Sequence, residues 1–422
     1  MQKNTKQSPK SISDLTLDKS QDKGGHAAAF LRLCERELGR SIRKLHDENL
    51  DIGALRADGV FVRKNKGHPV FDFAGEFHPR KSPLREEDRF KSLAELGLFF
   101  NFEFGPPATA RFLDGYFTPG NLSRAERVEL RKKLVKNLDR VFYTRLRNFD
   151  KFCTQQNASF APISISGCRG WRRTSVPEAD VQRLMARSAE IMENAKVLKS
   201  GRSSRVVLVE DFPHGPAVLK RMVPRDLHSR IKNMLRPAKA LRGWRFANGL
   251  VLRRVPCALP LAFWTRGAKG YLLTKFVDAT PLRVLLRSNV PAWNEMERAA
   301  AGEKLAALLA KTVRNLHNMG YSHRDLKPSN ILVELKAGIP IGVYIMDVDG
   351  IRAQYQPVPM SKRAKDLGRM AAPLTPFFGK EDCFIGRLVE NYLGWSAAKP
   401  DLVSQLSNLV RAQAARYSLR KR

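Results

Sequence analysis

The chain has 422 residues, 43% of them hydrophobic, and its 75 Lys and Arg against 41 Asp and Glu give a formal net charge of +34. This length exceeds the usual size of a single core and the hydrophobic share is enough for two, so we expect two globular modules. No apolar run approaches the roughly 18 residues of a membrane span. The five cysteines form no Cys-x-x-Cys pair, which argues against a structural metal and for a reducing compartment.

So large an excess of positive charge indicates a polyanionic partner. Nucleic acid, an anionic membrane surface and an acidic saccharide are the candidates, and a basic solvated surface without a partner is the plain alternative. Zinc-finger spacing, an aromatic RNA-binding pattern and a basic-region zipper are missing from the sequence, so nucleic acid has no support beyond charge. The amino terminus has no apolar signal core, and we expect a cytoplasmic protein.

The chain order predicts four segments. Residues 1–26 are polar and rich in Lys, Gln, Ser and Asp, which predicts a disordered tail. Residues 27–155 form the first module. Residues 156–180 are expected to be a linker, because 157–174 is rich in Ser, Gly and Pro. Residues 181–422 form the second module.

The second module begins with elements suited to the phosphates of ATP. Lys199–Val206 fits the register of a glycine-rich loop, with Gly201 at the middle glycine and Val206 at the residue that caps adenine. Only one glycine is present, but the loop also offers backbone N–H groups and three serines. Two short strands follow, and the second ends in Lys220, the expected contact of the α and β phosphates.

The next stretch departs from the usual kinase pattern. Between Asp226 and Asp278 there is no acidic residue, so the glutamate that usually pairs with Lys220 is missing. Residues 230–244 are strongly basic and predict a helix that presents cations. Two further strands are expected at 255–264 and 271–276, leading into a hinge where backbone groups would pair with adenine.

The most specific pattern is His323-Arg-Asp-Leu-Lys-Pro-Ser-Asn330, which a second segment, Asp347-Val-Asp349-Gly, follows. Leucines and a valine recur at helical spacing from Leu305 to Leu316, just before this pattern, and predict a buried helix that leads into the loop. Short β-rich runs at 331–333 and 343–346 predict a hairpin beside it.

These residue types are the ones that phosphoryl transfer requires: a carboxylate at the attacking hydroxyl, oxygen ligands for magnesium and cations on the phosphates. Asp325 is the candidate base that orients the acceptor hydroxyl. Asn330 and Asp347 are the candidate magnesium ligands, with Asp349 as a further candidate, and Lys327 is placed to offset charge on the transferred phosphoryl group.

Residues 165–422 resemble the lipopolysaccharide kinase (Kdo/WaaP) family, a bacterial branch of the protein-kinase-like fold. The resemblance rests on the loop 199–206, the basic helix 236–244, the segment 347–349 and the helix start 363–369. It implies an α+β fold with a strand-rich small lobe and a helical large lobe. It also implies that Asp366, in that helix start, anchors the catalytic loop.

The family further implies ATP and Mg²⁺ as cofactors and a sugar hydroxyl of the lipopolysaccharide core, on Kdo or heptose, as the acceptor. The substrate would then be an anionic, lipid-linked saccharide, which would bring the protein into peripheral contact with the inner membrane. The sequence carries no signal for an oligomeric state.

The first module resembles a degenerate copy of the large lobe without a small lobe. Residues 42–62 align on 313–333 without a gap, with identities at Arg43, Leu45, His46, Leu55 and Val62. Further on, Lys91-Ser92-Leu93 falls on Lys365-Asp366-Leu367, and 111–117 falls on 387–393.

In this alignment the catalytic side chains of the first copy are lost. Ala54 falls on Asp325 and Gly59 on Asn330, while Asp72 falls on Asp347 after a four-residue deletion. We therefore expect an inactive docking or stabilising platform. Chance similarity between two amphipathic helical segments is the alternative.

Two other functions stay open at this level. Lys327 and the Pro-Ser-Asn330 context favour a protein serine/threonine kinase. The missing glutamate, the single glycine of the loop and the inactive first copy favour a nucleotide-binding module with weak catalysis. The retention of Asp325, Asn330 and Asp347 argues for turnover.

Overall fold

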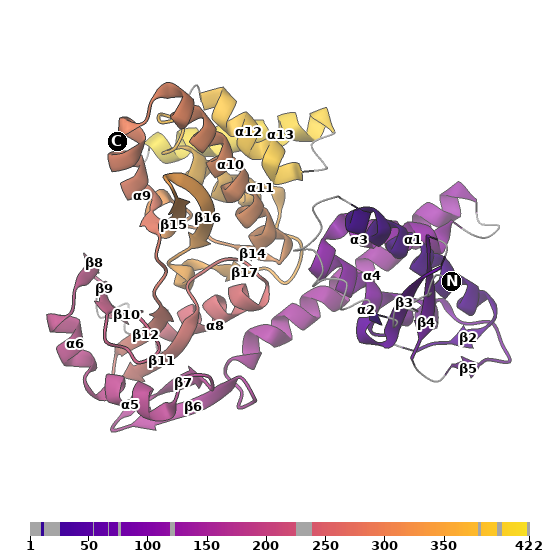
Figure 1. Ribbon diagram of the computed structural model, residues 1–422, viewed down its shortest axis with the longest axis horizontal. Coiled ribbons are helices and arrows are strands. Elements are labelled where there is room, and N and C mark those ends of the chain that lie inside the picture. The colour runs from indigo at the N-terminus through magenta and orange to yellow at the C-terminus, as the bar shows by residue number, and fades with distance from the viewer. Residues whose placement is uncertain are drawn as a thin grey trace, which may run out of the picture. The chain divides into compact units, whose positions relative to one another are not determined.

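The computed structural model describes residues 10–11, 26–53, 55–65, 67–74, 77–118, 123–224, 239–378, 381–394 and 399–419. The chain divides into two compact units, Met1–Phe142 (unit 1) and Tyr143–Arg422 (unit 2), each built of helices and strands (Figure 1). The prediction of a mixed α and β protein is therefore confirmed. Most of the tail predicted over 1–26 lies outside the described residues.

Unit 1 surrounds a small sheet with helices. Its helices are α1 (His26–Asp47), α2 (Glu86–Phe104), α3 (Pro106–Phe117) and the first part of α4 (Arg124–Phe152). Its strands are β1 (Lys10–Ser11), β2 (Leu50–Asp51), β3 (Val60–Asn65), β4 (His68–Phe73) and β5 (His78–Pro79). They form a three-stranded sheet in the order β1-β3-β4 and a separate β2-β5 pair.

The core of unit 1 depends on close packing between α1 and α3. Cys34, Leu38 and Ile42 recur at helical spacing along α1 and are buried. Gly115 allows the approach, because a Cβ there would lie 2.0 Å from the carbonyl oxygen of Arg36. Any larger residue at this position would push the helices apart.

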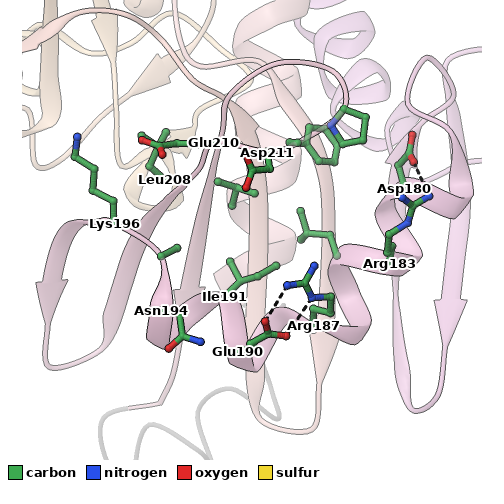
Figure 2. A pocket seen from close by; sticks show the side chains of 15 residues that line it. Asp180, Arg183, Arg187, Glu190, Ile191, Asn194, Lys196, Leu208, Glu210 and Asp211 are labelled. Carbon is green, nitrogen blue, oxygen red and sulfur yellow. Dashed lines mark hydrogen bonds and ion pairs between the residues drawn. The ribbon is translucent and has the colours of Figure 1, made fainter.

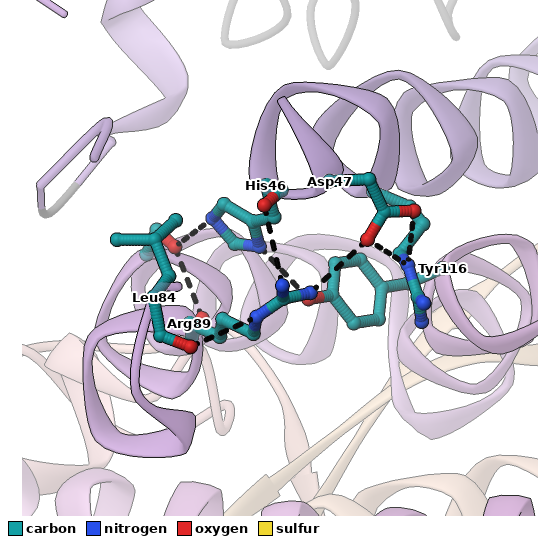
Figure 3. A network of polar contacts seen from close by, with 7 residues as sticks. His46, Asp47, Leu84, Arg89 and Tyr116 are labelled. Carbon is teal, nitrogen blue, oxygen red and sulfur yellow. Dashed lines mark hydrogen bonds and ion pairs between the residues drawn. The ribbon is translucent and has the colours of Figure 1, made fainter. Parts of the chain in front are cut away.

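A buried histidine network joins the helices of unit 1 (Figure 3). His46 Nδ1 lies 2.8 Å from the Tyr116 hydroxyl and His46 Nε2 lies 2.9 Å from Ser92 Oγ. Arg89 closes the network by donating to the carbonyl oxygens of His46 at 3.2 Å and Leu84 at 3.4 Å. Burial, with smaller contributions from nearby charges, lowers the pKa of His46 to about 4, so the ring is neutral at pH 7.

Unit 2 opens with a seven-stranded sheet in the order β6-β7-β11-β12-β10-β9-β8. The strands are β6 (Phe160–Ile165), β7 (Cys168–Arg173), β8 (Val197–Gly201), β9 (Ser204–Val209), β10 (Ala217–Met222), β11 (Pro260–Arg266) and β12 (Lys269–Lys275). One core cluster joins this sheet to α5 (Glu178–Ala186) and α6 (Ser188–Asn194), and another joins it to α8 (Lys239–Leu252).

The linker expected over 156–180 is instead part of this sheet. The β6-β7 hairpin occupies most of it, and β7 pairs with β11 along five residues. Gly170 permits the pairing, because a Cβ there would lie 1.8 Å from the carbonyl oxygen of Phe263. The glycines and serines that suggested a linker therefore serve a tight hairpin and a close strand contact.

The rest of unit 2 is mainly helical. Its elements are β13 (Thr280–Pro281), α9 (Leu282–Val284), α10 (Glu295–Asn318), β14 (Tyr321–Ser322), β15 (Ile331–Lys336), β16 (Ile339–Ile345), β17 (Arg352–Ala353), α11 (Met360–Ala371), α12 (Glu381–Leu393) and α13 (Pro400–Leu419). Short helical turns cover Leu285–Asn289, Val290–Ala292, Pro328–Asn330 and Val348–Gly350. The buried helix and the hairpin predicted beside the catalytic loop are α10 and β15-β16.

Asn294 begins α10 with a capping box, in which its side chain accepts from the Glu297 N–H at 2.9 Å and Glu297 accepts from the Asn294 N–H at 3.0 Å. Leu305, Leu309 and Val313 then face the core, as their spacing predicted. Across the ranges that the structure describes, no helix is long and apolar enough to cross a bilayer.

Candidate active site

The nucleotide-side residues predicted from the sequence meet on one face of the large sheet. Val206 on β9 and Lys220 on β10 are direct cross-strand partners, and Lys199 on β8 pairs with Val206. Gly201 closes β8 and pairs with Ser204, so the predicted glycine-rich loop is a tight β8-β9 turn. Val207 and Leu219, which alternate with these residues, point to the opposite face and enter the core there.

Lys220 has acidic partners that the sequence reading did not find. Its Nζ donates to Asp347 Oδ1 at 2.5 Å and lies 3.8 Å from Asp349 Oδ2. Both carboxylates come from the short turn after β16, from a segment more than a hundred residues away in the sequence. Asp347 and Asp349 therefore pair with Lys220, for which the segment between Asp226 and Asp278 offers no glutamate.

The charges of this pair of carboxylates are unequal. Burial alone would raise the pKa of Asp347, but the neighbouring Lys220 ammonium lowers it to about 2. Burial raises the pKa of Asp349 above its ordinary value, and the Lys220 charge offsets only part of this. Asp347 is therefore the firmly ionised member, and Asp349 carries the proton more readily.

The catalytic loop is held by a buried carboxylate from α11. Asp366 Oδ2 accepts from the backbone N–H of His323 at 2.7 Å, and Oδ1 accepts from the backbone N–H of Arg324 at 3.0 Å. Asp366 Oδ2 also lies 3.2 Å from His317 Nε2. Burial opposes ionisation of Asp366, but the bonds from His317 and His323 outweigh it and lower its pKa. This is the anchoring role that the resemblance implied.

Two residues have positive φ angles, one in the catalytic loop and one in the turn after β16. Arg324 has φ 68° and Asp347 has φ 56°, in the left-handed region that residues other than glycine rarely adopt. Such conformations cluster at functional sites, where the surrounding hydrogen bonds over-determine them. His323 supplies one of these bonds, because its Nε2 lies 2.9 Å from the carbonyl oxygen of Met346, the residue before Asp347.

Two polar side chains of the catalytic loop converge on the Asp325 carboxylate. Lys327 Nζ donates to Asp325 Oδ2 at 2.7 Å, and Asn330 Nδ2 lies 3.3 Å from the same oxygen. Asn330 Nδ2 also donates to the backbone carbonyl of Asp325 at 3.0 Å. The Asp325 side chain is 48% exposed, so an acceptor hydroxyl can reach it.

Asn330 in the catalytic loop and Asp347 in the turn after β16 are suitable ligands for a magnesium ion. Asn330 is buried, and its Oδ1 accepts no hydrogen bond from the residues that the structure describes. The backbone joins it to the other ligand, because the Met346 N–H donates to the Asn330 carbonyl at 2.8 Å. One amide oxygen and one ionised carboxylate suit Mg²⁺, which completes its shell with water and phosphate oxygens. Among the described residues, no group of three or more His, Cys, Asp or Glu side chains is placed to hold a metal ion.

The structure of unit 1 does not fit one equivalence of the predicted repeat. Asp72 lies within β4 and its carboxylate contacts Arg63 at 3.2 Å, so it does not follow the strand as Asp347 does. The Ala74 N–H donates to the Gly59 carbonyl at 2.8 Å, the bond that Met346 makes to Asn330 in unit 2. The alignment of Asp72 on Asp347 is therefore wrong by three residues. The residue after Ala74 in the sequence is Gly75, which lies outside the described residues, as does Ala54.

A hollow on the other face of the large sheet is separate from these residues (Figure 2). It is lined by α5, α6 and the β9 end, with Asp180, Arg187, Glu190 and Asp211 among its polar side chains. Arg187 and Glu190 form an ion pair at 2.8 Å across its wall. The mixed charges largely pair with each other, and none of the predicted site residues borders it.

The basic helix expected over 230–244 is described from Lys239, where α8 begins. Residues 225–238 lie outside the described residues. Within α8, Gly243 lies close to the turn after β16 that carries Asp347 and Asp349, here called the metal turn. A Cβ on Gly243 would be 3.9 Å from the Cβ of Asp349. The charge of Arg242 also acts on the Asp349 carboxylate and lowers its pKa, against the larger effect of burial. The charge of one cation of this helix, Arg242, therefore acts on the turn that follows β16.

The sheet that presents a lysine, the carboxylate-anchored loop and the metal-competent turn together define a kinase-like phosphotransferase. Residues 229–385 match the model of the lipopolysaccharide kinase (Kdo/WaaP) family. The match confirms the resemblance drawn from the sequence over this part of the chain. It also confirms the predicted enzyme class, since members of that family are kinases that act on sugar hydroxyls.

Among solved structures, one titled "WaaP in complex with acyl carrier protein" is similar to this chain. The identity is 17% and the TM-score 0.39, and the match covers 56% of this chain and 98% of that one. At these values the likeness says nothing about activity or partners. A comparison with curated proteins gives no match.

Proposed function

We propose that unit 2 transfers the γ-phosphoryl group of ATP, with Mg²⁺, to a sugar hydroxyl of the lipopolysaccharide core, on Kdo or heptose. The observation that carries the proposal is the convergence of Lys220, Asp347, Asn330 and Asp325, since kinase chemistry requires these groups together. The family match over 229–385 favours a sugar acceptor. The sheet region 160–275 then serves as the small lobe and residues 280–419 as the large lobe.

Each side chain has a defined task in this mechanism. Lys220 releases Asp347 and binds the α and β phosphates, with Gly201 and Val206 enclosing the phosphates and the adenine. Asn330 and Asp347 would hold magnesium, which would supply positive charge to offset that of the phosphates. Asp325 accepts a hydrogen bond from the attacking hydroxyl and aligns it. Lys327 offsets charge on the transferred group.

The proposal also places the protein in the cytoplasm beside the inner membrane. A lipid-linked, anionic saccharide lies at that surface, and a net charge of +34 attracts it. A phosphorylated or carboxylated sugar would also bind the cations of α8, which begins beside the metal turn. Association should therefore weaken as ionic strength rises.

The deciding experiment is transfer of labelled γ-phosphate from Mg·ATP by the full chain to a lipopolysaccharide-core extract, with a generic basic protein as a second acceptor. We expect label in the saccharide, lowered about 10²- to 10⁴-fold by Asp325→Asn, because the variant keeps the shape of the side chain but loses its charge. Lys311→Gln changes an exposed lysine of α10 that is not among these residues, so it is the control and should transfer normally.

Label only in the protein acceptor would move the assignment to a serine/threonine kinase, which Lys327 favours. ATP binding with no label that depends on Asp325 would identify the weakly catalytic nucleotide-binding module instead. Either result would overturn the sugar acceptor.

For unit 1 we infer a second relation: it is a degenerate copy of the large lobe of unit 2. The elements correspond in order, as α1, β2, β3, β4, β5, α2 and α3 match α10, β14, β15, β16, β17, α11 and α12. The sheet orders β1-β3-β4 and β13-β15-β16 also match. In register, Lys10 pairs with Val62 as Thr280 pairs with Val333, and Leu50 pairs with Pro79 as Tyr321 pairs with Ala353.

Backbone conformation supports the copy independently of side-chain similarity. Three pairs of positions, each 271 residues apart, share positive φ: Asn49 (57°) with Gly320 (76°), Gly53 (57°) with Arg324 (68°), and Gly67 (88°) with Gly338 (79°). Chance similarity between amphipathic helices would not reproduce turns of this kind between them. The loss of the carboxylates at the aligned positions makes unit 1 a platform and not a second catalytic unit.

A further inference from the structure

The last turns of α4 lie within unit 2 and carry a buried carboxylate that the mechanism above does not use. Asp150 is 7% exposed and Arg253, at the end of α8, is 1% exposed. Arg253 Nη1 donates to Asp150 Oδ1 at 2.7 Å. Buried charges are costly unless they are paired and hydrogen-bonded, so a pair at this depth calls for an explanation.

Two tyrosines bind the same carboxylate from the direction of the catalytic loop. The Tyr321 hydroxyl donates to Asp150 Oδ1 at 2.5 Å, and the Tyr355 hydroxyl donates to Oδ2 at 2.9 Å. Tyr321 is on β14, two residues before His323, and Tyr355 follows β17, the strand paired with β14. Burial raises the pKa of Tyr321 well above its ordinary value, so its hydroxyl remains a donor.

Arg253 ties α8 to the same point. Its Nη1 also donates to the Gly249 carbonyl and its Nη2 to the Leu146 carbonyl on α4, each at 3.0 Å. The guanidinium lies 4.2 Å from the centre of the Tyr321 ring. Gly249 is required for the approach, because a Cβ there would lie 2.4 Å from the Tyr321 hydroxyl and 2.9 Å from Asp150 Oδ1.

A second attachment holds the other end of α8. Trp244 is fully buried, and its indole N–H donates to the carbonyl oxygen of Cys153, just beyond the end of α4, at 2.8 Å. Trp244 and Cys153 share one apolar cluster with Leu272 of the large sheet. The end of α4 therefore contacts α8 through Trp244 and, through the bond between Asp150 and Tyr321, also β14, the strand that leads into the catalytic loop.

These contacts matter because α8 borders the metal turn and lacks any acidic residue. In kinases an ion pair between a helix glutamate and the phosphate-binding lysine fixes the corresponding helix. Here Lys220 pairs with Asp347 and Asp349 instead, and α8 needs another anchor.

We propose that Asp150 is a positioning residue, the hub through which the end of α4 fixes α8 and the catalytic loop relative to each other for phosphoryl transfer. The proposal rests on the proposed function for its effect on rate. Its physical core is that one carboxylate joins three segments, through Arg253 just after α8, Tyr321 on β14 and Tyr355 two residues after β17. Removing either hydroxyl or the carboxylate should loosen the loop and the helix together, without removing any group that touches ATP.

The test compares Tyr355→Phe and Asp150→Asn with the full wild-type chain by amide hydrogen exchange without ligand. Peptides from 243–252 and 317–330 should exchange at least about fivefold faster, while peptides from 204–222 should not change. Tyr344→Phe is the matched control, because Tyr344 also donates a hydroxyl to a carboxylate, Glu334 at 2.8 Å, away from the hub. It should leave the exchange of both peptides unchanged.

The second readout is transfer from Mg·ATP to the core extract. Tyr355→Phe should lower kcat about tenfold with less than a twofold change in KM for ATP, because the nucleotide contacts remain intact. Equal loosening in Tyr344→Phe, or unchanged exchange in both hub variants, would overturn the proposal. If wild-type protein transfers no phosphate, the proposed function fails and the exchange comparison still decides whether the hub exists. Should Asp150→Asn fail to fold, Tyr355→Phe alone carries the test.

Discussion

His46 in unit 1 and His317 in unit 2, which lie 271 residues apart in the sequence, have the same kind of partner on one ring nitrogen and different partners on the other. Both place Nδ1 2.8 Å from a tyrosine hydroxyl, of Tyr116 and Tyr392 respectively. At Nε2 they differ, because His46 meets the hydroxyl of Ser92 and His317 meets the carboxylate of Asp366.

The difference reaches the loop that each network supports. A carboxylate can accept several hydrogen bonds, and Asp366 uses this capacity to hold two backbone N–H groups of the catalytic loop. Ser92 Oγ contacts His46 and the Arg89 carbonyl, and the Gly53 N–H is held by Asp51 Oδ1 at 3.0 Å instead. The serine hydroxyl therefore satisfies the histidine in unit 1, whereas the carboxylate in unit 2 also holds the backbone of the loop.

Replacing Asp366 by Ser should have the largest effect on this difference, because it gives His317 in unit 2 the partner that His46 has in unit 1, a serine hydroxyl. We expect a loss of about 3 kcal/mol in the free energy of unfolding of unit 2, since two buried N–H groups lose their acceptor. We also expect transfer to fall by about two orders of magnitude. Denaturant unfolding followed by tryptophan fluorescence measures the first quantity, because all five tryptophans follow residue 143. Stability within 1 kcal/mol of wild type would contradict the anchoring role.

Acid titration sharpens the comparison at the histidines. The pKa of His46 is about 4 in the folded state, below its ordinary value of 6.5, so between these pH values the unfolded chain binds a proton that folded unit 1 does not. The stability of unit 1 should therefore fall as the pH drops from 6.5 to 4, by roughly 3 kcal/mol in total, and then level off.

In unit 2 burial also lowers the pKa of His317, but the Asp366 carboxylate offsets part of the effect. Hydrogen exchange of peptides from 86–104, compared with peptides from 360–371 over the same pH range, measures the two units separately. His46→Gln should remove the pH dependence of unit 1. A unit 1 that keeps its full protection down to pH 4 would contradict the neutral, buried assignment.

The smallest expected effect comes from the tyrosine hydroxyl that each network contains, that of Tyr116 in unit 1 and that of Tyr392 in unit 2. Tyr116→Phe and Tyr392→Phe each remove a hydrogen bond to a buried histidine and should each cost about 1 kcal/mol in the unit concerned. Exchange protection in the two units measures this. Since the distances are the same, a cost more than about 2 kcal/mol larger in one unit would show that the networks are not equivalent.

Local motifs allowed the sequence to identify most of the candidate site. Asp325, Lys327 and Asn330 lie within six residues, so their convergence follows from one loop. Lys220 and Val206 follow from the strand period, which places them opposite each other. Identities such as His46 and Leu55 were enough to suggest the copy in unit 1.

Features that depend on distant contacts were missed. Asp347, the nearer partner of Lys220, is 127 residues away in the sequence, and no local pattern assigns it to Lys220 in place of a helix glutamate. The hub at Asp150 joins residues up to 205 positions apart, and an aspartate in a basic helix gives no sign of burial. The predicted alignment of Asp72 on Asp347 failed for a related reason. It depended on where a deletion falls within the β3-β4 hairpin, and the pairing of the two strands, which decides this, cannot be read from the sequence.

The pairing of β1 with β3 in unit 1 and that of β13 with β15 in unit 2 are both antiparallel. Unit 1 also has an apolar core cluster of its own, which takes in no residue of the large sheet. Because a domain with its own core could in principle fold alone, we expect unit 1 to fold without help from that sheet.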